Sequence, residues 1–138
     1  MIKITKERSV SIDDVLHLYQ AVGWTNYTNQ PEMLEQALSH SLAIYVALDG
    51  DAVVGLIRLV GDGFSSVFVQ DLIVLPTYQR QGIGSNLMKE ALADYNDAYQ
   101  VQLATEQTEK NLGFYRSLGF ETLSTYDCAG MIWVDREK

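Results

Sequence analysis

The chain has 138 residues, of which 47% are hydrophobic and 20% are charged, and its formal net charge at pH 7 is −8. This size and mixture predict a single globular domain over residues 1–138 that buries about two-thirds of its unfolded surface. The negative charge argues against nucleic acid as a partner, because binding to phosphates needs a basic surface, but it is compatible with a cationic small molecule.

The sequence also limits the compartment and the kind of site. No apolar stretch has the length of a membrane span, and the first residues lack the apolar core of a signal peptide. The single cysteine, Cys128, suits a reducing compartment. We therefore expect a cytoplasmic protein without a membrane partner. His17 and His40 are far apart and no Cys/His cluster exists, so we expect no metal site.

The first half of the chain predicts a strand, two helices and a hairpin. Residues 2–5 have the composition of a short strand. Ser11 followed by Asp14 resembles a capping box for a helix over residues 11–22, which Gly23 ends. A loop over residues 24–30 leads to Pro31, which opens a second helix. Residues 42–48 and 53–60 are typical of a β-hairpin.

The second half predicts four more strands and two helices. Residues 66–75 are apolar on both faces, so this strand should lie centrally in the sheet. Helices are expected over about 83–96 and 107–118, with a strand over 99–105 between them and Gly119 as a left-handed cap. Two final strands are expected over 121–127 and 129–135. The order β-α-α-β-β-β-α-β-α-β-β indicates an α/β (α+β) domain with a mixed sheet rather than repeated βαβ units.

The stretch "LPTYQRQGIGSNLMKEAL" (75–92) passes from a strand through two glycines into a helix. A helix N-terminus carries unpaired N–H groups and partial positive charge, and Gly82 and Gly84 let a ligand approach the backbone. The pattern favours an anion cradle, to which Arg80 could add a charged contact. It lacks the Gly-Lys-Ser/Thr of a Walker loop and the third glycine of the dinucleotide fingerprint. A plain strand-to-helix turn is the alternative.

Gln79, Gly82 and Gly84 match the pattern Arg/Gln-x-x-Gly-x-Gly/Ala, and the stretch resembles the acyl-CoA motif of the GNAT superfamily of N-acetyltransferases. The stretches "GWTNYT", "RLVGDG" and "QDLIVLP" together resemble a small uncharacterised bacterial branch of that superfamily. The resemblance covers essentially the whole chain. It implies a mixed, mostly antiparallel central sheet flanked by helices, with acetyl-CoA as the acyl donor and no metal. It also implies that the pyrophosphate is cradled by Gln79, Arg80, Gln81, Gly82, Ile83, Gly84 and Ser85.

The same resemblance gives roles to two further segments. The strand before the loop should splay from its neighbour at a bulge, so that the backbone of Leu72, Ile73 and Val74 holds the pantetheine arm. The stretch "NLGFYRSLGF" (111–120) resembles the family's later helix, Asn-x-x-Ala-x-x-Phe/Leu-Tyr-x-x-x-Gly-Phe. It departs from that pattern at two positions, because Thr108 stands where the family has Asn and Asn111 where it has Ala. The cofactor contacts implied in this segment are Thr108, Asn111, Phe114 and Tyr115.

The general acid and the general base of the transfer are expected on different residues. The resemblance implies that Tyr115 protonates the departing CoA thiolate, and a phenol is protonated at neutral pH; a core tyrosine is the alternative. The glutamate that some relatives use as base is absent, since Leu103 stands there. Gln70 and Asp71 are adjacent polar residues on opposite faces of an apolar strand. Asp71 could take the amine proton directly or through a water, or it could be a structural carboxylate.

The acceptor side is expected in the loop "GWTNYTN" (23–29), as the resemblance implies. Trp24 and Tyr27 could pack as a lid or form a cage for a cationic amine, with negative charge from Asp62 and Asp71. We expect transfer of an acetyl group from acetyl-CoA to a primary amine of a small molecule or peptide by direct attack in a ternary complex. The alternatives are a non-catalytic acyl-CoA sensor and a domain that binds no CoA. The sequence is also compatible with a homodimer through the last strands.

Overall fold

The computed structural model describes residues 1–7 and 10–134. The chain divides into two compact units, Met1–Leu103 and a second unit that begins at Ala104. The single domain over residues 1–138 therefore stays a prediction.

The first unit is built on a sheet whose described strands run in the order β1-β2-β3-β4-β5. Neighbouring strands pair antiparallel up to β4, and β5 pairs parallel to β4. This confirms the mixed, mostly antiparallel sheet and the place of β4 inside it. The strands span Ile2–Glu7 (β1), Ala43–Asp49 (β2), Ala52–Gly61 (β3), Ser66–Val74 (β4) and Gln100–Leu103 (β5).

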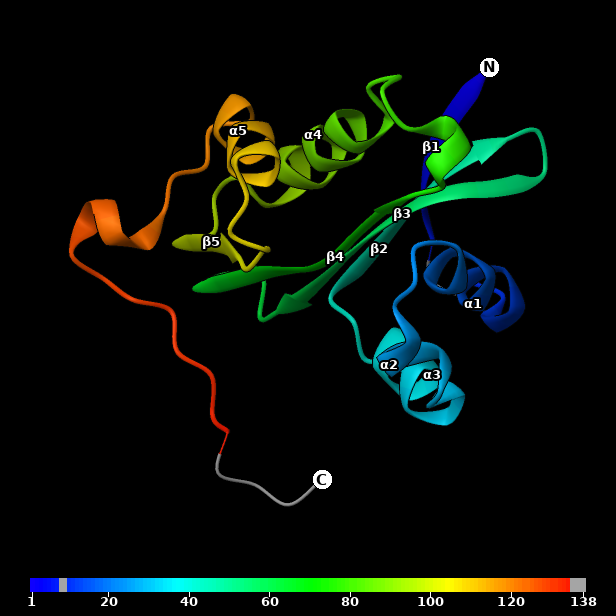
Figure 1. The fold of residues 1–138 in the computed structure, drawn as a ribbon, viewed down its shortest axis with the longest axis horizontal. Helices are drawn as coiled ribbons and strands as arrows, with labels where there is room; N and C mark the ends of the chain where they lie inside the picture. Colours follow the sequence, from blue (N-terminus) through cyan, green and yellow to red (C-terminus); the bar gives the residue numbers. More distant parts are fainter. Residues whose placement is uncertain (8–9, 135–138) are drawn as a thin grey trace. The chain divides into compact units, whose positions relative to one another are not determined.

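Helices cover both faces of this sheet, as Figure 1 shows. One face carries α1 (Ile12–Ala21), α2 (Thr25–Thr28) and α3 (Pro31–Ser39). The other face carries α4 (Ile83–Tyr95). On the first face the buried core comprises Val15, Leu18, Tyr19, Leu34, Leu38, Ile44, Val46, Leu56 and Ile73. The buried side chains of α4 are Ile83, Leu87, Met88 and Ala91, which repeat at helical spacing.

Two details near the N-terminus differ from the prediction. Helix α1 begins where expected, but Ser11 makes no side-chain cap hydrogen bond, so the capping box is wrong. The predicted loop over 24–30 contains the short helix α2, and the polar sequence "TNYT" does not predict a helix there. Gly23, at a φ of +79°, lies between α1 and α2 and confirms the expected break.

The second unit contains α5 (Glu109–Ser117) and a 3-10 helix, η2 (Leu123–Tyr126). The Gly119 cap is confirmed: its φ is +100°, and Phe120 N–H donates to the Tyr115 carbonyl over 3.0 Å. The two predicted final strands are wrong over the described residues. Residues 123–126 close into η2, which ends at Asp127 with a φ of +58°. Residues 129–134 have no regular structure, and Asp135 lies outside the described residues.

Candidate functional site

A bulge in β4 interrupts the pairing of this strand with β3. Arg58 of β3 pairs with Asp71, but the next residue, Leu59, pairs with Val69. Gln70 is therefore the extra residue, and it is exposed while Asp71 beside it is buried. The bulge falls at the two adjacent polar residues that the sequence singled out. Burial still alternates through it, with Gln70 exposed and Asp71 buried, as expected for side chains on different faces.

Beside the bulge, β4 leaves its neighbour. The pairing of β4 with β5 covers only Ser66–Val69, opposite Gln100–Leu103. The N–H of Leu75 donates to the carbonyl of Val54, on the β3 side. Because peptide groups alternate in direction along a strand, those of Leu72 and Val74 point to the opposite side, past the last residue of β5. Ile73, with a buried side chain, has its peptide groups on the β3 side.

The loop after β4 holds an exposed, unusual backbone. A 3-10 turn, η1 (Pro76–Tyr78), is followed by Gln79, whose side chain donates to the Val74 carbonyl over 3.1 Å. Arg80 and Gly82 both have positive φ, +66° and +79°. A Cβ added to Gly82 would have nothing within 4 Å. The side of Gly82 that a side chain would occupy is thus open.

Helix α4 begins directly after this loop, with Gly82 as its N-cap and no side-chain cap. Its first intrahelical bond runs from Asn86 N–H to the Gly82 carbonyl over 3.0 Å. Within the part of the chain that the structure describes, the N–H groups of Ile83, Gly84 and Ser85 donate to no protein group. Ile83 contributes its amide only, since its side chain is buried. These amides at the positive end of a helix suit an anion.

A buried network lies on the α1 face of the sheet, at the bulge. Asp71 and Arg58 are 3% and 4% exposed, and Arg58 Nε donates to Asp71 Oδ2 over 2.7 Å. Tyr19 donates to the same oxygen over 2.6 Å, and Tyr27 donates to Asp71 Oδ1 over 3.2 Å. Three donors therefore occupy the carboxylate, which has about four acceptor positions.

The surroundings of Tyr19 and Arg58 raise the pKa of both side chains, so both keep their protons. Burial, followed by the negative charge of Asp71 and the hydrogen bond to it, raises the pKa of Tyr19 far above its usual value of 10.0. Burial alone would lower the pKa of Arg58, but the attraction of Asp71 outweighs it and the pKa of Arg58 is raised. Tyr19 is therefore a neutral donor and Arg58 a cation at any ordinary pH.

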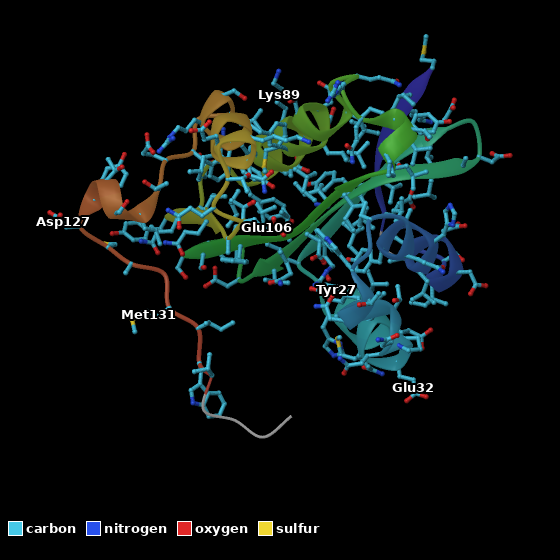
Figure 2. The ribbon with its side chains drawn as sticks, in the orientation of Figure 1. Tyr27, Glu32, Lys89, Glu106, Asp127 and Met131 are labelled. Atoms are coloured by element: carbon cyan, nitrogen blue, oxygen red, sulfur yellow. The ribbon has the colours of Figure 1, made fainter. Side chains whose placement is uncertain are left out.

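Trp24 and Tyr27 pack against Tyr19 of the network, whereas a cation–π cage would need their faces turned toward a ligand. Their rings lie edge-on to Tyr19, with centroids 5.8 and 4.8 Å away. Tyr27, labelled in Figure 2, reaches from α2 toward the sheet. Asp62 lies in the β3–β4 turn, where it accepts three backbone N–H groups and the Ser65 hydroxyl. These contacts favour packing and turn-capping roles for Trp24 and Asp62.

In the second unit, α5 carries the tyrosine that the sequence singled out. Tyr115 is half-buried between Phe114 and Phe120, at centroid distances of 5.0 and 6.1 Å. Burial raises the pKa of the Tyr115 phenol above 10.0. The side chain is therefore a neutral O–H donor at neutral pH, as a general acid must be.

Thr108 and Asn111 face each other at the start of α5. Thr108 is the N-cap, and its Oγ1 accepts the Asn111 N–H over 3.1 Å. The side-chain amide of Asn111 donates to Thr105 Oγ1 over 3.1 Å. The structure thus shows Thr108 as a helix N-cap, and its contact with the cofactor stays a prediction.

Sequence reasoning missed Arg58, Tyr19 and Ser41, which Arg58 Nη1 reaches over 3.3 Å. Arg58 was visible as a lone charge in the apolar run "VVGLIRLV", and Tyr19 as a phenol on the apolar face of α1. A hairpin register that set residue 58 opposite residue 71 would have connected the two charges. In the described ranges, no group of three His, Cys, Asp or Glu side chains could hold a metal ion. Nor is any described helix long and apolar enough to cross a bilayer.

Comparisons with known proteins identify the class. A family model described as an acetyltransferase (GNAT) domain matches residues 40–122, and the chain belongs to this family. This confirms the resemblance, the fold class and, at the level of the family, the expected acyltransferase. The chain is 79% identical to an acetyltransferase of the GNAT family from Streptococcus pneumoniae TIGR4, with a TM-score of 0.92 over 99% of this chain and 100% of that chain.

One further relative and one protein of the same fold are less similar to the chain. The chain is 32% identical over 95 residues to the chloroplastic serotonin N-acetyltransferase 2 of rice. The matched residues cover 66% of this chain and 48% of the rice protein. The chain thus spans about half the length of this curated relative. An N-acetyltransferase from Thermoplasma acidophilum, solved in complex with coenzyme A, is 16% identical and shares the fold, with a TM-score of 0.68 over 86% of this chain and 90% of that chain.

Proposed function

We propose that this protein transfers an acetyl group from acetyl-CoA to a primary amine by direct attack in a ternary complex. The observation that carries the proposal is the continuous stretch from β4 to α4. It offers strand backbone without a β5 partner and then, within a few residues, three unpaired amides at a helix N-terminus. An extended arm that ends in a pyrophosphate needs donors in this order.

The donor would be held mainly by the backbone. The peptide groups of Leu72 and Val74 would pair with the pantetheine arm, and residues 79–85 would surround the pyrophosphate. Arg80 would add the one positive side chain of this loop, which is exposed. In a chain of net charge −8, backbone amides are a suitable means of binding phosphates. A shared fold with a protein solved in complex with coenzyme A is in keeping with this donor.

In the proposed reaction the amine nitrogen attacks the thioester carbonyl carbon and the carbon–sulfur bond breaks. The N–H of Val74, on the side of β4 away from β3, would polarise the carbonyl oxygen. Tyr115 would give its proton to the departing sulfur, and its raised pKa keeps that proton available. The nitrogen would release one proton to solvent as the amide forms, and the phenolate would regain one from solvent. Much of the acceleration would come from holding both reactants together.

The base role of Asp71 stays a prediction, and the geometry restricts it. The carboxylate is buried and three donors occupy it, so an amine cannot reach it directly. Tyr27 is the half-buried phenol of the network, and its hydroxyl donates to Asp71 Oδ1 over 3.2 Å. In the base role, the amine proton would reach Asp71 through this hydroxyl.

The acceptor is proposed by class only. The rice relative is named for serotonin, an arylalkylamine, and a negatively charged protein attracts cationic amines. Trp24 and Tyr27 remain the proposed contacts for the apolar part of such an amine. The cation–π cage is the weaker form of this proposal, because both rings pack edge-on against Tyr19.

A cytoplasmic homodimer belongs to the same proposal. Met131, Ile132 and Val134 are 95%, 77% and 78% exposed and stand in a segment without regular structure. A run of apolar residues with strand composition is a common means of association between copies. Sedimentation of the whole chain and of a chain ended at residue 127 would test it. Equal monomer masses for both would contradict the dimer.

The function is tested by following CoA thiol release from acetyl-CoA with a panel of amines that begins with arylalkylamines. The expected result is amine-dependent release by the wild-type protein. Saturable acetyl-CoA binding with no turnover on any amine would favour the sensor, to which the buried Asp71 with its three donors and the capping role of Thr108 lend support. A folded protein that neither binds nor turns over acetyl-CoA would contradict both.

A further inference from the structure

Arg58 and Asp71 are the two charged side chains buried in the described core. They are also cross-strand partners at the exact step where the β3–β4 register shifts. Arg58 and Asp71 thus form the regular cross-strand pair that directly adjoins the bulge. The extra residue, Gln70, lies immediately next to it.

The network around this pair fixes the bulge from several elements. Tyr19 brings α1 to Asp71, and Tyr27 brings α2. Arg58 extends to the Ser41 hydroxyl over 3.3 Å and to the Tyr27 hydroxyl over 3.4 Å. No buried side-chain nitrogen or oxygen in the described chain lacks a hydrogen-bond partner. A fully satisfied buried network is rigid, and it accepts one arrangement of its parts.

Stability alone does not account for the pair. A buried ion pair contributes little more than apolar residues of similar volume, because both charges lose their water. The pair instead helps to determine to which side of β4 the peptide groups after the bulge point. Without the extra residue, each residue of β4 after the bulge would shift by one place, and its side chain and peptide group would change sides. The peptide groups at Leu72 and Val74 would then turn toward β3.

We propose that the Arg58–Asp71 pair is a positioning element for the acyl donor. It holds the bulge at Gln70 and thereby directs the peptide groups of Leu72 and Val74 toward the side of β4 on which the pantetheine arm would lie. Arg58 acts here as a positioning residue, and so does Asp71, in place of the proton-accepting role. This inference rests on the proposed function.

The test is calorimetric titration of acetyl-CoA into the double variant Arg58→Met/Asp71→Leu, which removes both charges, conserves volume approximately and leaves the net charge unchanged. The expected result is a folded protein whose acetyl-CoA Kd rises about tenfold or more, because the donor atoms are misplaced. The control is Lys6→Met/Asp94→Asn, which removes an exposed ion pair of 3.8 Å between β1 and α4 and keeps an acceptor for the Tyr45 hydroxyl. Its Kd should stay at the wild-type value.

The outcomes separate the two proposals. A wild-type protein that does not bind acetyl-CoA would overturn the proposed function and the inference with it. A wild-type protein that binds, with a folded double variant that binds equally well, would overturn the inference alone. Amide NMR shifts of Leu72 and Val74 in the ligand-free proteins give a readout independent of binding: they should move in the double variant and not in the control.

If the double variant does not fold, Arg58→Lys and Asp71→Asn replace it. Arg58→Lys keeps the charge but cannot reach both Ser41 and Tyr27, and we expect KM for acetyl-CoA to rise with kcat nearly unchanged. For Asp71→Asn, a positioning role predicts the same KM rise at every pH. A loss of kcat that follows pH, with KM unchanged, would overturn the positioning role and identify Asp71 as the base.

Discussion

The bulge of β4 and the loop that follows it lie only a few residues apart, yet they hold their shapes by opposite means. At the bulge, the buried side chains of Arg58 (β3) and Tyr19 (α1) and the half-buried Tyr27 (α2) converge on Asp71. In the loop, the side chains of residues 79–82 are exposed, and the shape comes from the positive φ of Arg80 and Gly82. One region is fixed by long-range contacts and the other by local backbone conformation.

This difference separates what each region can do. The loop presents N–H groups and open space, so a ligand can meet the backbone itself. The bulge network presents almost nothing to solvent, so it acts by fixing its own strand. We therefore expect changes in the network to reduce stability first, and changes in the loop to reduce ligand binding first.

The largest effect on stability is expected for Arg58→Met alone. It leaves the Asp71 charge buried without its cation, which costs about 3–5 kcal/mol of the free energy of unfolding. Urea unfolding measures this loss. Lys6→Met is the control, because its partner Asp94 is half-exposed and such pairs contribute about 0–1 kcal/mol. A loss for Arg58→Met as small as the control's would contradict a tightly coupled network.

The largest effect on turnover is expected for Tyr115→Phe. Removing a general acid should lower kcat by about 10²-fold or more. The acetyl-CoA Kd should stay near the wild-type value, because the phenyl ring still packs against Phe114 and Phe120. Tyr126→Phe, at an exposed tyrosine of the same unit, serves as the control. Equal kcat in wild type and Tyr115→Phe would remove this tyrosine from the reaction.

A smaller effect, but a sharper contrast, is expected for Gly82→Val against Gly50→Val. Both glycines have positive φ, +79° and +62°, and at both an added Cβ would meet nothing within 4 Å. Each variant should therefore lose a similar 1–3 kcal/mol or so to backbone strain. Only Gly82→Val should weaken acetyl-CoA binding, by about tenfold, or 1.4 kcal/mol. Equal binding by the two folded variants would mean that the loop is a turn and no more.

The smallest effect is a pH dependence that belongs to the network. The pKa of Tyr19 is raised above 10.0 in the folded protein, first by burial and then by Asp71. Above pH 10 the unfolded chain loses this proton while the folded protein keeps it, so stability should fall as pH rises. One such group contributes a slope of up to about 1.4 kcal/mol per pH unit. Tyr19→Phe should be less stable at pH 7 but show a shallower alkaline slope in thermal unfolding.

The same contrast explains what the sequence could predict. The loop was predictable because its information is local: Gln79, Gly82 and Gly84 stand at fixed spacing between a strand and a helix. The alternating and helical apolar patterns likewise predicted β1 to β5 and all the longer helices. The family comparison agrees with the motif, since its match over residues 40–122 includes both stretches that carried the resemblance.

The network was not predictable in the same way. It depends on a register between β3 and β4 that shifts by one residue, and on two tyrosines from helices about 50 residues earlier in the chain. Asp71 was recognised as a buried charge, but its partners were not. The final strands failed for a related reason. Residues 129–134 have strand composition, but a strand also needs a hydrogen-bonding neighbour, and composition does not supply one.

The most direct test of the central claim compares two titrations into the wild-type protein, one with acetyl-CoA and one with S-acetylpantetheine, which lacks the pyrophosphate. The account predicts saturable binding of acetyl-CoA and much weaker binding of the fragment, because the loop amides of residues 83–85 would have no anion to meet. Equal affinities would contradict the anion cradle. No binding of acetyl-CoA at millimolar concentration by a folded sample would contradict the proposed function itself.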